Sequence, residues 1–193
     1  MTRIAIFASG TGSNAQKIIE YFKNHRSIIV SLVVCNKPGA GVIDIATQNN
    51  IPVLMIDADK ERFFRGDGFL PELKSHRINF IVLAGFLWKI PLTLTNAYQD
   101  AIINIHPALL PAYGGRGMYG MAVHAAVLRA GEKQSGITIH FVDEQYDNGD
   151  IIFQERLDIT ESDTPETLAE KIHELEHQHF PRIIEQVVTL KGW

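Results

Sequence analysis

Short, continuous apolar runs alternate along the first hundred residues with segments whose apolar side chains recur at helical spacing. The runs are four to eight residues long and are bounded by glycine, proline or asparagine, which is typical of buried strands. Continuous apolar strands separated by helices indicate a parallel sheet covered on both faces. The predicted strands are 3–8, 28–35, 53–56, 80–84 and 101–105, and the predicted helices are 15–24, 42–48 and 69–75.

The last third of the chain has a different pattern. Segments 136–142 and 151–157 are strand-like and flank an acidic loop, as in an antiparallel pair. Thr164 and Pro165 then form a helix start, followed by an apolar stripe that includes Leu168. We therefore predict one α/β domain over residues 1–193, with an open, mostly parallel Rossmann-like sheet, helices on both faces and a mixed or antiparallel C-terminal end.

Composition narrows the function classes. The chain has 193 residues, is 46% hydrophobic and carries a formal net charge of −4, which argues against a broad basic surface for nucleic acid. Its apolar runs are far shorter than the ~18 residues of a membrane span. The single cysteine, Cys35, lies in an apolar run and is expected to be strand packing. We expect a soluble, cytoplasmic protein with no nucleic-acid or membrane partner.

A glycine turn follows the first predicted strand. Gly10 and Gly12 lie before a helix, an arrangement that directs backbone N–H groups at one point and favours an anion there. A dinucleotide site would need an acid after the second strand, where the chain has Asn36 instead. Ser13 and Asn14 add donors suited to a phosphate monoester. A tight turn without a ligand remains the alternative.

Asn104 and His106 end the strand 101–105. Alternate strand residues face the same way, and Pro107 keeps His106 extended, so the two side chains are expected to converge. This edge of a parallel sheet is where open α/β proteins bind ligands. An amide beside an imidazole suits a carbonyl oxygen that gains negative charge in acyl transfer. A purely structural histidine is the alternative.

The acidic loop DEQYDNGD resembles a calcium loop only in its charge. Gln145 and Asn148 occupy positions where the EF-hand pattern requires an acid or asparagine and a glycine. A hydrophilic turn is the simpler interpretation. From this loop Asp147 can reach His106, and His140 on the preceding strand is expected to face the same cleft.

His173 and His177 match the HExxH pattern of zinc peptidases. Such sites need a third protein ligand, and none follows at a suitable spacing. The helical period turns both histidines away from the apolar stripe of their helix, so we expect a solvated face without metal.

These segments together resemble the folate-dependent formyltransferases, in the same order along nearly the whole chain. The matching stretches are SGTGSN at 9–14, VLAGF at 82–86, NIHPALLP at 104–111, HFV at 140–142 leading to Asp147, Glu176-His177 and Phe180-Pro181. Within the family, the glycine turn and the short length point to the member that formylates glycinamide ribonucleotide in purine synthesis. The resemblance also favours a cis peptide at Leu110-Pro111.

The resemblance implies the following chemistry. A formyl group passes from 10-formyltetrahydrofolate, a co-substrate, to an amine without a metal. The implied catalytic residues are Asn104, His106 and Asp147, with Asp147 favouring the protonated imidazole. The substrate-binding residues would be Gly12, Ser13, Asn14 and Glu176, and the folate-binding residues Leu87, Trp88, Lys89, Ile90, Asn104 and Asp143.

Two features depart from the family pattern. Trp88-Lys89 stands where many relatives have an arginine, which leaves Lys60, Arg62 or neither as the basic folate contact, and segment 112–123 is longer and glycine-rich. Rival functions are a sugar-amine formyltransferase, methionyl-tRNA formyltransferase, a formyltetrahydrofolate hydrolase and a non-catalytic nucleotide-binding module. The tRNA enzyme and the hydrolase each have an additional domain that is not expected here, and the module has no use for Asn104 and Asp147.

Overall fold

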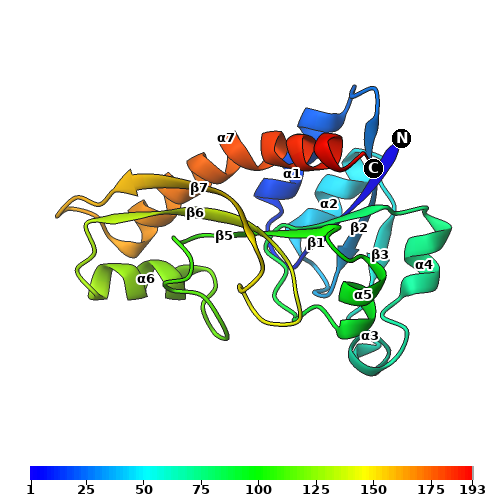
Figure 1. Cartoon of the computed structure of the whole chain (residues 1–193), viewed down its shortest axis with the longest axis horizontal. Coiled ribbons are helices and arrows are strands. Elements are labelled where there is room, and N and C mark those ends of the chain that lie inside the picture. Colours follow the sequence, from blue (N-terminus) through cyan, green and yellow to red (C-terminus); the bar gives the residue numbers. More distant parts are fainter. Residues whose placement is uncertain (193) are drawn as a thin grey trace.

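The computed structural model describes residues 1–192, which form one seven-stranded sheet in the order β3-β2-β1-β4-β5-β6-β7 (Figure 1). The strands are β1 (Thr2–Ala8), β2 (Ile28–Cys35), β3 (Val53–Met55), β4 (Phe80–Leu83), β5 (Ile102–His106), β6 (Gln134–Phe141) and β7 (Ile151–Asp158). The helices are α1 (Ser13–Phe22), α2 (Gly41–Gln48), α3 (Lys60–Arg65), α4 (Leu70–Ser75), α5 (Leu92–Ala97), α6 (Met121–Arg129) and α7 (Pro165–Lys191).

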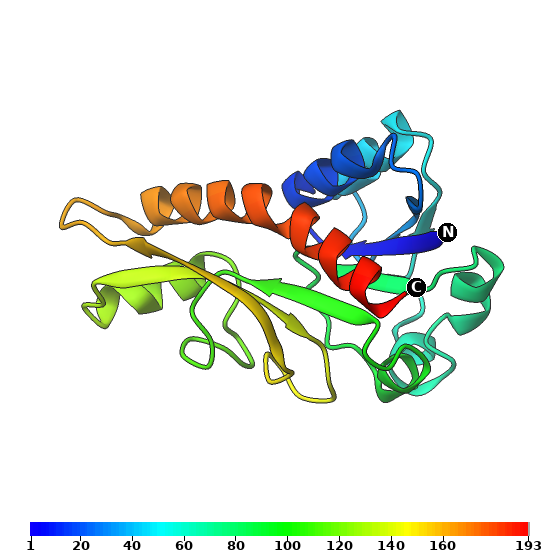
Figure 2. The same ribbon diagram turned by 45° about the horizontal axis from the view of Figure 1, so that its top comes forward.

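The sheet is parallel from β3 to β5 and antiparallel from β5 to β7. In both ribbon views, α1 and α7 lie on one side of the sheet and α3 and α5 on the other (Figures 1 and 2). Covered faces explain why the central strands β1 and β4 are apolar and buried at almost every position. The predicted fold class is confirmed, including the antiparallel C-terminal end.

Three helices were not predicted: α3, α5 and α6. The first two have six residues each, too few for an apolar stripe to repeat at helical spacing. Helix α6 begins at Met121, inside the segment expected to be a glycine-rich loop, so that loop ends at Gly120. The helix packs against α7 and carries a buried histidine, His124, in its first turn.

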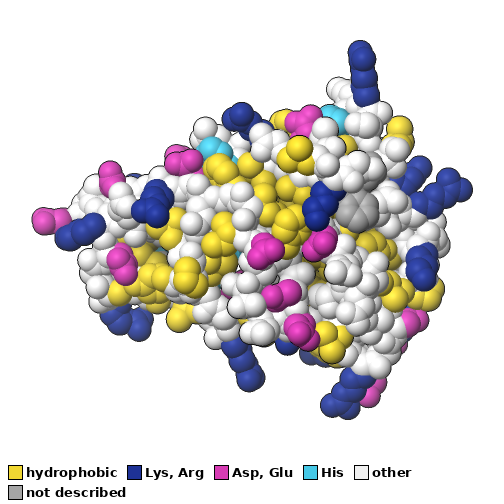
Figure 3. Space-filling view, in the orientation of Figure 1, with side chains coloured by type: hydrophobic (Ala, Val, Ile, Leu, Met, Phe, Trp, Pro, Cys, Tyr) yellow, Lys and Arg dark blue, Asp and Glu magenta, His cyan; other side chains and the backbone are white. Residues whose placement is uncertain are grey.

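Three features of the surface and the core bear on the predicted function class: membrane-spanning helices, basic patches and the single cysteine. Over residues 1–192, no helix is long and apolar enough to cross a membrane. On the face shown in Figure 3, lysine and arginine side chains are scattered, mostly around the rim, and form no continuous patch. Cys35 is buried, and burial raises the pKa of its thiol.

Candidate active site

A cleft of about 660 Å³ opens at the carboxyl ends of β1, β4 and β5. Ligand sites of open α/β sheets lie at this edge. The cleft contains the residues predicted from five separate parts of the sequence. The predicted site residues that line it are Gly12, Ser13, Asn14, Leu87, Trp88, Lys89, Ile90, Asn104, His106, Asp143, Asp147 and Glu176.

The glycine turn forms one wall of this cleft. Gly12 precedes α1 with a φ of 85°, and a Cβ there would lie 2.8 Å from the Val42 Cα, so only glycine fits. Helix α1 has no side-chain cap and no acidic residue in its first turn. Its first N–H groups have no partner within the helix, so the turn can bind an anion through the backbone.

A side-chain hydrogen bond links Asn14 of α1 to Glu176 of α7, and both residues line the cleft. The Asn14 Nδ2 donates a hydrogen bond of 2.7 Å to Glu176 Oε2. Burial raises the pKa of Glu176, while the contacts from Asn14 and His173 oppose that shift. The Asn14 side-chain donor therefore points to Glu176, and the turn offers a phosphate its backbone donors.

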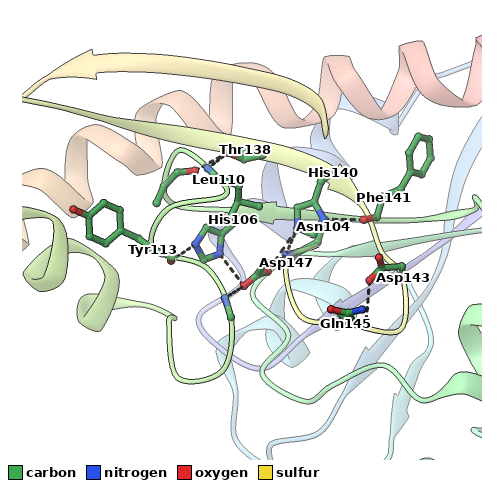
Figure 4. Close-up of polar contacts among 12 residues, drawn as sticks. Asn104, His106, Leu110, Tyr113, Thr138, His140, Phe141, Asp143, Gln145 and Asp147 are labelled. Carbon is green, nitrogen blue, oxygen red and sulfur yellow. Dashed lines mark hydrogen bonds and ion pairs between the residues drawn. The ribbon is translucent and has the colours of Figure 1, made fainter. Parts of the chain in front are cut away.

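His106 lies at the end of β5 and is buried. Its Nε2 is 2.8 Å from the Tyr113 carbonyl oxygen, which can only accept, so Nε2 carries a proton. Its Nδ1 lies 3.6 Å from Asp147 Oδ2 (Figure 4). Burial lowers the pKa of His106, and the neighbouring Asp147 carboxylate raises it by less. Asp147 thus favours the protonated imidazole, as the sequence predicts, but desolvation of the cation is the larger effect and lowers the pKa on balance.

Asn104 lies between His140 and Asp147. His140 Nδ1 donates to the Phe141 carbonyl oxygen at 2.8 Å, which leaves His140 Nε2 as an acceptor. The Asn104 Nδ2 donates to this nitrogen at 3.1 Å and to Asp147 Oδ1 at 3.4 Å (Figure 4). Asn104 and His106 were expected to converge, and both contact the Asp147 carboxylate, while His140 faces the same cleft.

Asp147 is held in place from several directions. Its Oδ2 accepts a hydrogen bond of 2.9 Å from the Gly115 N–H. Burial alone would raise the pKa of Asp147, but the contacts with His140, His106 and this N–H outweigh it and lower the pKa. Asp147 is thus a carboxylate that is only 11% exposed at its side chain and whose ionised form is favoured by its contacts. In the same loop Asp143 accepts hydrogen bonds from the Gln145 N–H at 2.8 Å and from a second side chain.

Thr138, on β6, supports the turn that follows His106, and the sequence pattern did not reveal this role. Its hydroxyl donates to the Ala108 carbonyl oxygen at 2.6 Å and accepts from the Leu110 N–H at 3.0 Å. Gln154 Nε2 adds a third contact to the same hydroxyl at 2.9 Å. These bonds hold the turn after His106, which ends in the predicted cis peptide Leu110-Pro111.

The end of the cleft for which folate contacts were predicted carries the apolar residues Leu87, Trp88 and Ile90. Trp88 packs against Phe63 and Phe64, with Lys60 Nζ 5.4 Å from the centre of its ring. Arg62, the other basic residue considered for this side, is bound by Asp67 and by Glu72. Arg62 is thus already paired with two carboxylates, and neither Lys60 nor Arg62 is among the described residues that line the cleft.

The two histidines of the HELEH segment, both expected on a solvated face, differ in exposure. His173 is exposed and lines the cleft, whereas His177 is half-buried with an unpartnered Nε2, so the predicted solvated face is wrong for His177. It lies near Lys17 and Glu20 of α1. Within residues 1–192, no three His, Cys, Asp or Glu side chains form a group that could hold a metal ion.

Comparison with known proteins places the whole chain in one family. Residues 2–184 match the family model described as formyl transferase. The chain is 40% identical to phosphoribosylglycinamide formyltransferase of Bacillus subtilis, over 100% of this chain and 97% of that protein. It is 42% identical to the chloroplastic enzyme of that name from Arabidopsis thaliana, over 94% of this chain and 64% of that protein. This chain thus spans less than two thirds of the plant relative.

Solved structures agree with this assignment. The phosphoribosylglycinamide formyltransferase of Bacillus halodurans superposes with a TM-score of 0.87 at 38% identity, covering 97% of this chain and 95% of that one. Glycinamide ribonucleotide transformylase 1 from Geobacillus kaustophilus gives a TM-score of 0.88 at 37% identity, covering 97% and 98%. With a cleft that joins the glycine turn to an amide, an imidazole and a carboxylate, this chain belongs to the formyl transferase family.

Proposed function

We propose that this protein transfers the formyl group of 10-formyltetrahydrofolate to the amine of glycinamide ribonucleotide, giving the N-formyl product and tetrahydrofolate in purine synthesis. The observation that carries the proposal is that Asn104, His106 and Asp147 share one cleft with the glycine turn at Gly12. The names of the relatives in Bacillus subtilis and Arabidopsis thaliana support the choice of substrate. We further propose that residues 1–193 act as a single cytoplasmic domain.

The two substrates would enter from opposite ends of the cleft. The phosphate of glycinamide ribonucleotide would bind at Gly12, Ser13 and Asn14, through the free N–H groups of α1. Glu176, buried behind Asn14, would accept hydrogen bonds from the ribose. The folate would lie on the apolar side, with contacts from Leu87, Trp88, Lys89, Ile90, Asn104 and Asp143.

Transfer requires stabilisation of a tetrahedral intermediate. The amine attacks the formyl carbon, and the carbonyl oxygen gains negative charge as the new C–N bond forms. The Asn104 Nδ2 would turn from His140 and Asp147 to donate to this oxygen, with His106 as the second donor. Developing negative charge beside His106 would raise the pKa of its imidazole, which burial keeps low in the free protein.

Asp147 is the proposed proton carrier. As the C–N bond to the folate breaks, the attacking amine loses a proton and the departing folate nitrogen gains one. An ionised Asp147, directly or through water, would accept the first proton and deliver the second. The 3.6 Å distance between Asp147 Oδ2 and His106 Nδ1 supports this role.

The test is incubation of the purified protein with 10-formyltetrahydrofolate and glycinamide ribonucleotide, following folate product absorbance and the mass of the formylated product. We expect one formylated product per folate consumed. A reaction without acceptor and a reaction with a nucleotide-linked amino sugar serve as controls. Equal folate consumption without acceptor would mean a hydrolase, and preferential formylation of the amino sugar would mean a sugar-amine formyltransferase; either result contradicts the proposal.

A further inference from the structure

Few charged side chains line the cleft, although its proposed substrate carries a phosphate. Within the described chain, the lining carboxylates are Asp143, Asp147 and Glu176, and the lining lysine and arginine side chains are Lys89 and Arg116. A phosphate monoester near pH 7 carries a charge of about −1.5 to −2, while a helix N-terminus supplies only about half a positive charge. A phosphate in this cleft therefore calls for a cationic side chain besides the turn at Gly12.

Lys89 is engaged on the folate side. Its Nζ lies 5.8 Å from the centre of the Tyr146 ring, and its neighbour Trp88 packs on Phe63. One lysine of α1 and one of α7 are also paired, since Lys17 contacts Glu20 at 3.3 Å and Lys171 contacts Asp163 at 2.7 Å. Neither of those two lines the cleft.

Arg116 has no such partner. Within residues 1–192, its side chain makes no hydrogen bond, ion pair or ring contact, and it is exposed at the cleft. An unpaired guanidinium is free to form the bidentate contacts that suit a phosphate. Arg116 is therefore a cation that lines the cleft and has no ion-pair partner among residues 1–192.

The loop that carries Arg116 is attached to the catalytic centre. The N–H of the preceding Gly115 donates the hydrogen bond to Asp147. Gly115 and Gly117 have φ values of 92° and 89°. Arg116 therefore lies between two residues in a backbone conformation that residues other than glycine rarely adopt. The loop then enters α6, which packs against α7, the helix that bears Glu176. Through α6 and α7, the loop that carries Arg116 is therefore linked to the side of the cleft that contains Asn14.

We propose that Arg116 makes the charged contact to the phosphate of the substrate, from the loop opposite the glycine turn, and so selects phosphorylated over unphosphorylated acceptors. The inference rests on the proposed function. It adds a specificity residue outside the turn, and it explains why a glycine-flanked loop with an exposed arginine is anchored at Asp147. Substrate binding would neutralise a cation next to the group that moves the proton.

The test compares Arg116→Ala and Arg116→Lys with the wild type, using glycinamide ribonucleotide and its dephosphorylated riboside. The loss of a charge-assisted contact should raise KM for the ribonucleotide by about 10- to 100-fold, with a smaller change in kcat. KM for the riboside should stay within about 2-fold, because the lost partner is absent from it. The lysine variant keeps the charge without the bidentate geometry and should lie between the two.

Arg129→Ala is the matched control. Arg129 is exposed at the end of α6 and does not line the cleft, so its loss removes the same charge from the same part of the fold. We expect wild-type KM values for this variant. Calorimetric binding of the ribonucleotide should follow the same order as KM, and equal thermal unfolding curves will show that the variants are folded.

The ways in which the experiment can fail are distinguishable. If Arg116→Ala raises KM equally for ribonucleotide and riboside, or for neither, the phosphate contact is wrong while the proposed function stands. If the Arg129 variant loses affinity to the same degree, a general charge effect replaces the specific contact. If the wild-type protein formylates no ribonucleotide at all, the proposed function and this inference fall together.

Discussion

The Asn14 amide nitrogen donates a hydrogen bond of 2.7 Å to Glu176 across 162 residues of sequence. The bond links the first turn of α1 to the middle of α7, and Glu176 is only 5% exposed. A carboxyl group buried in this way is stabilised in its neutral form, and burial raises its pKa. The proposed substrate end of the cleft is thus built around a carboxyl group that resists ionisation.

The raised pKa of Glu176 predicts how stability depends on pH. Between the unfolded pKa and the raised folded pKa, the native state binds a proton that the unfolded state has lost, so stability falls as pH rises through this window. Glu176→Gln keeps an acceptor for Asn14 and cannot ionise. We expect the variant to gain unfolding free energy relative to the wild type as pH rises from about 4 towards neutral, on the order of 1 kcal/mol. Denaturant unfolding at several pH values measures this, and parallel pH curves would contradict it.

Substitutions at the proposed catalytic residues should affect mainly kcat, whereas a substitution in the glycine turn should affect mainly substrate binding. His106→Ala and Asp147→Asn should each lower kcat by ~10²-fold or more, with little change in substrate affinity. Asn14→Ala should show the opposite balance, with weaker ribonucleotide binding and a smaller loss of turnover. Steady-state kinetics and calorimetry on folded variants make the comparison. Near-normal turnover in His106→Ala would remove the proposed mechanism.

Asp147 should also control the ionisation of His106. Burial lowers the pKa of His106 and the Asp147 carboxylate partly restores it. In Asp147→Asn the opposing charge is gone, so we expect the pKa of His106 to fall further below its ordinary value. Titration of the imidazole resonances by NMR measures the change. An unchanged or higher pKa in the variant would mean that the 3.6 Å contact has no electrostatic weight.

Gly12 and Gly10 provide a matched pair in one turn. Alanine at position 12 would need a φ near 85° and would bring its Cβ to 2.8 Å from Val42, whereas a Cβ at Gly10 meets nothing within 4 Å. We expect Gly12→Ala to lose about 1–3 kcal/mol of unfolding free energy and to weaken ribonucleotide binding. Gly10→Ala should change stability by less than about 1 kcal/mol. Equal losses in the two variants would contradict this account of the turn.

Thr138 should act through the turn after His106. Thr138→Val removes the hydroxyl that serves Ala108 and Leu110 and leaves buried backbone groups unpaired, at a cost of about 1–3 kcal/mol each. We expect lower stability and lower kcat, because His106 loses its support. Thr138→Ser retains the hydroxyl and should recover most of both. Thermal unfolding and kinetics test the pair, and a serine variant as impaired as the valine variant would point to lost methyl packing instead.

Local sequence patterns determined the strands and the turns of this protein. The apolar runs of β1 and β4 predict buried parallel strands because both faces of the sheet are covered. The turn at Gly12 could be predicted because glycine is the residue that tolerates its backbone angle. The shared orientation of Asn104 and His106 could be predicted because alternate residues of a strand share a face. The family motifs then assigned roles to Asp147 and Glu176.

Only the tertiary structure decided the charge states and the supporting contacts. The lowered pKa of His106 depends on how deeply the end of β5 is buried, and no local pattern encodes the balance between desolvation and the Asp147 charge. The support from Thr138 and the contact between Gly115 and Asp147 join segments about thirty residues apart. Hydrogen bonds between distant segments depend on strand register and loop path, which arise from packing the whole chain, so the sequence pattern alone does not reveal them.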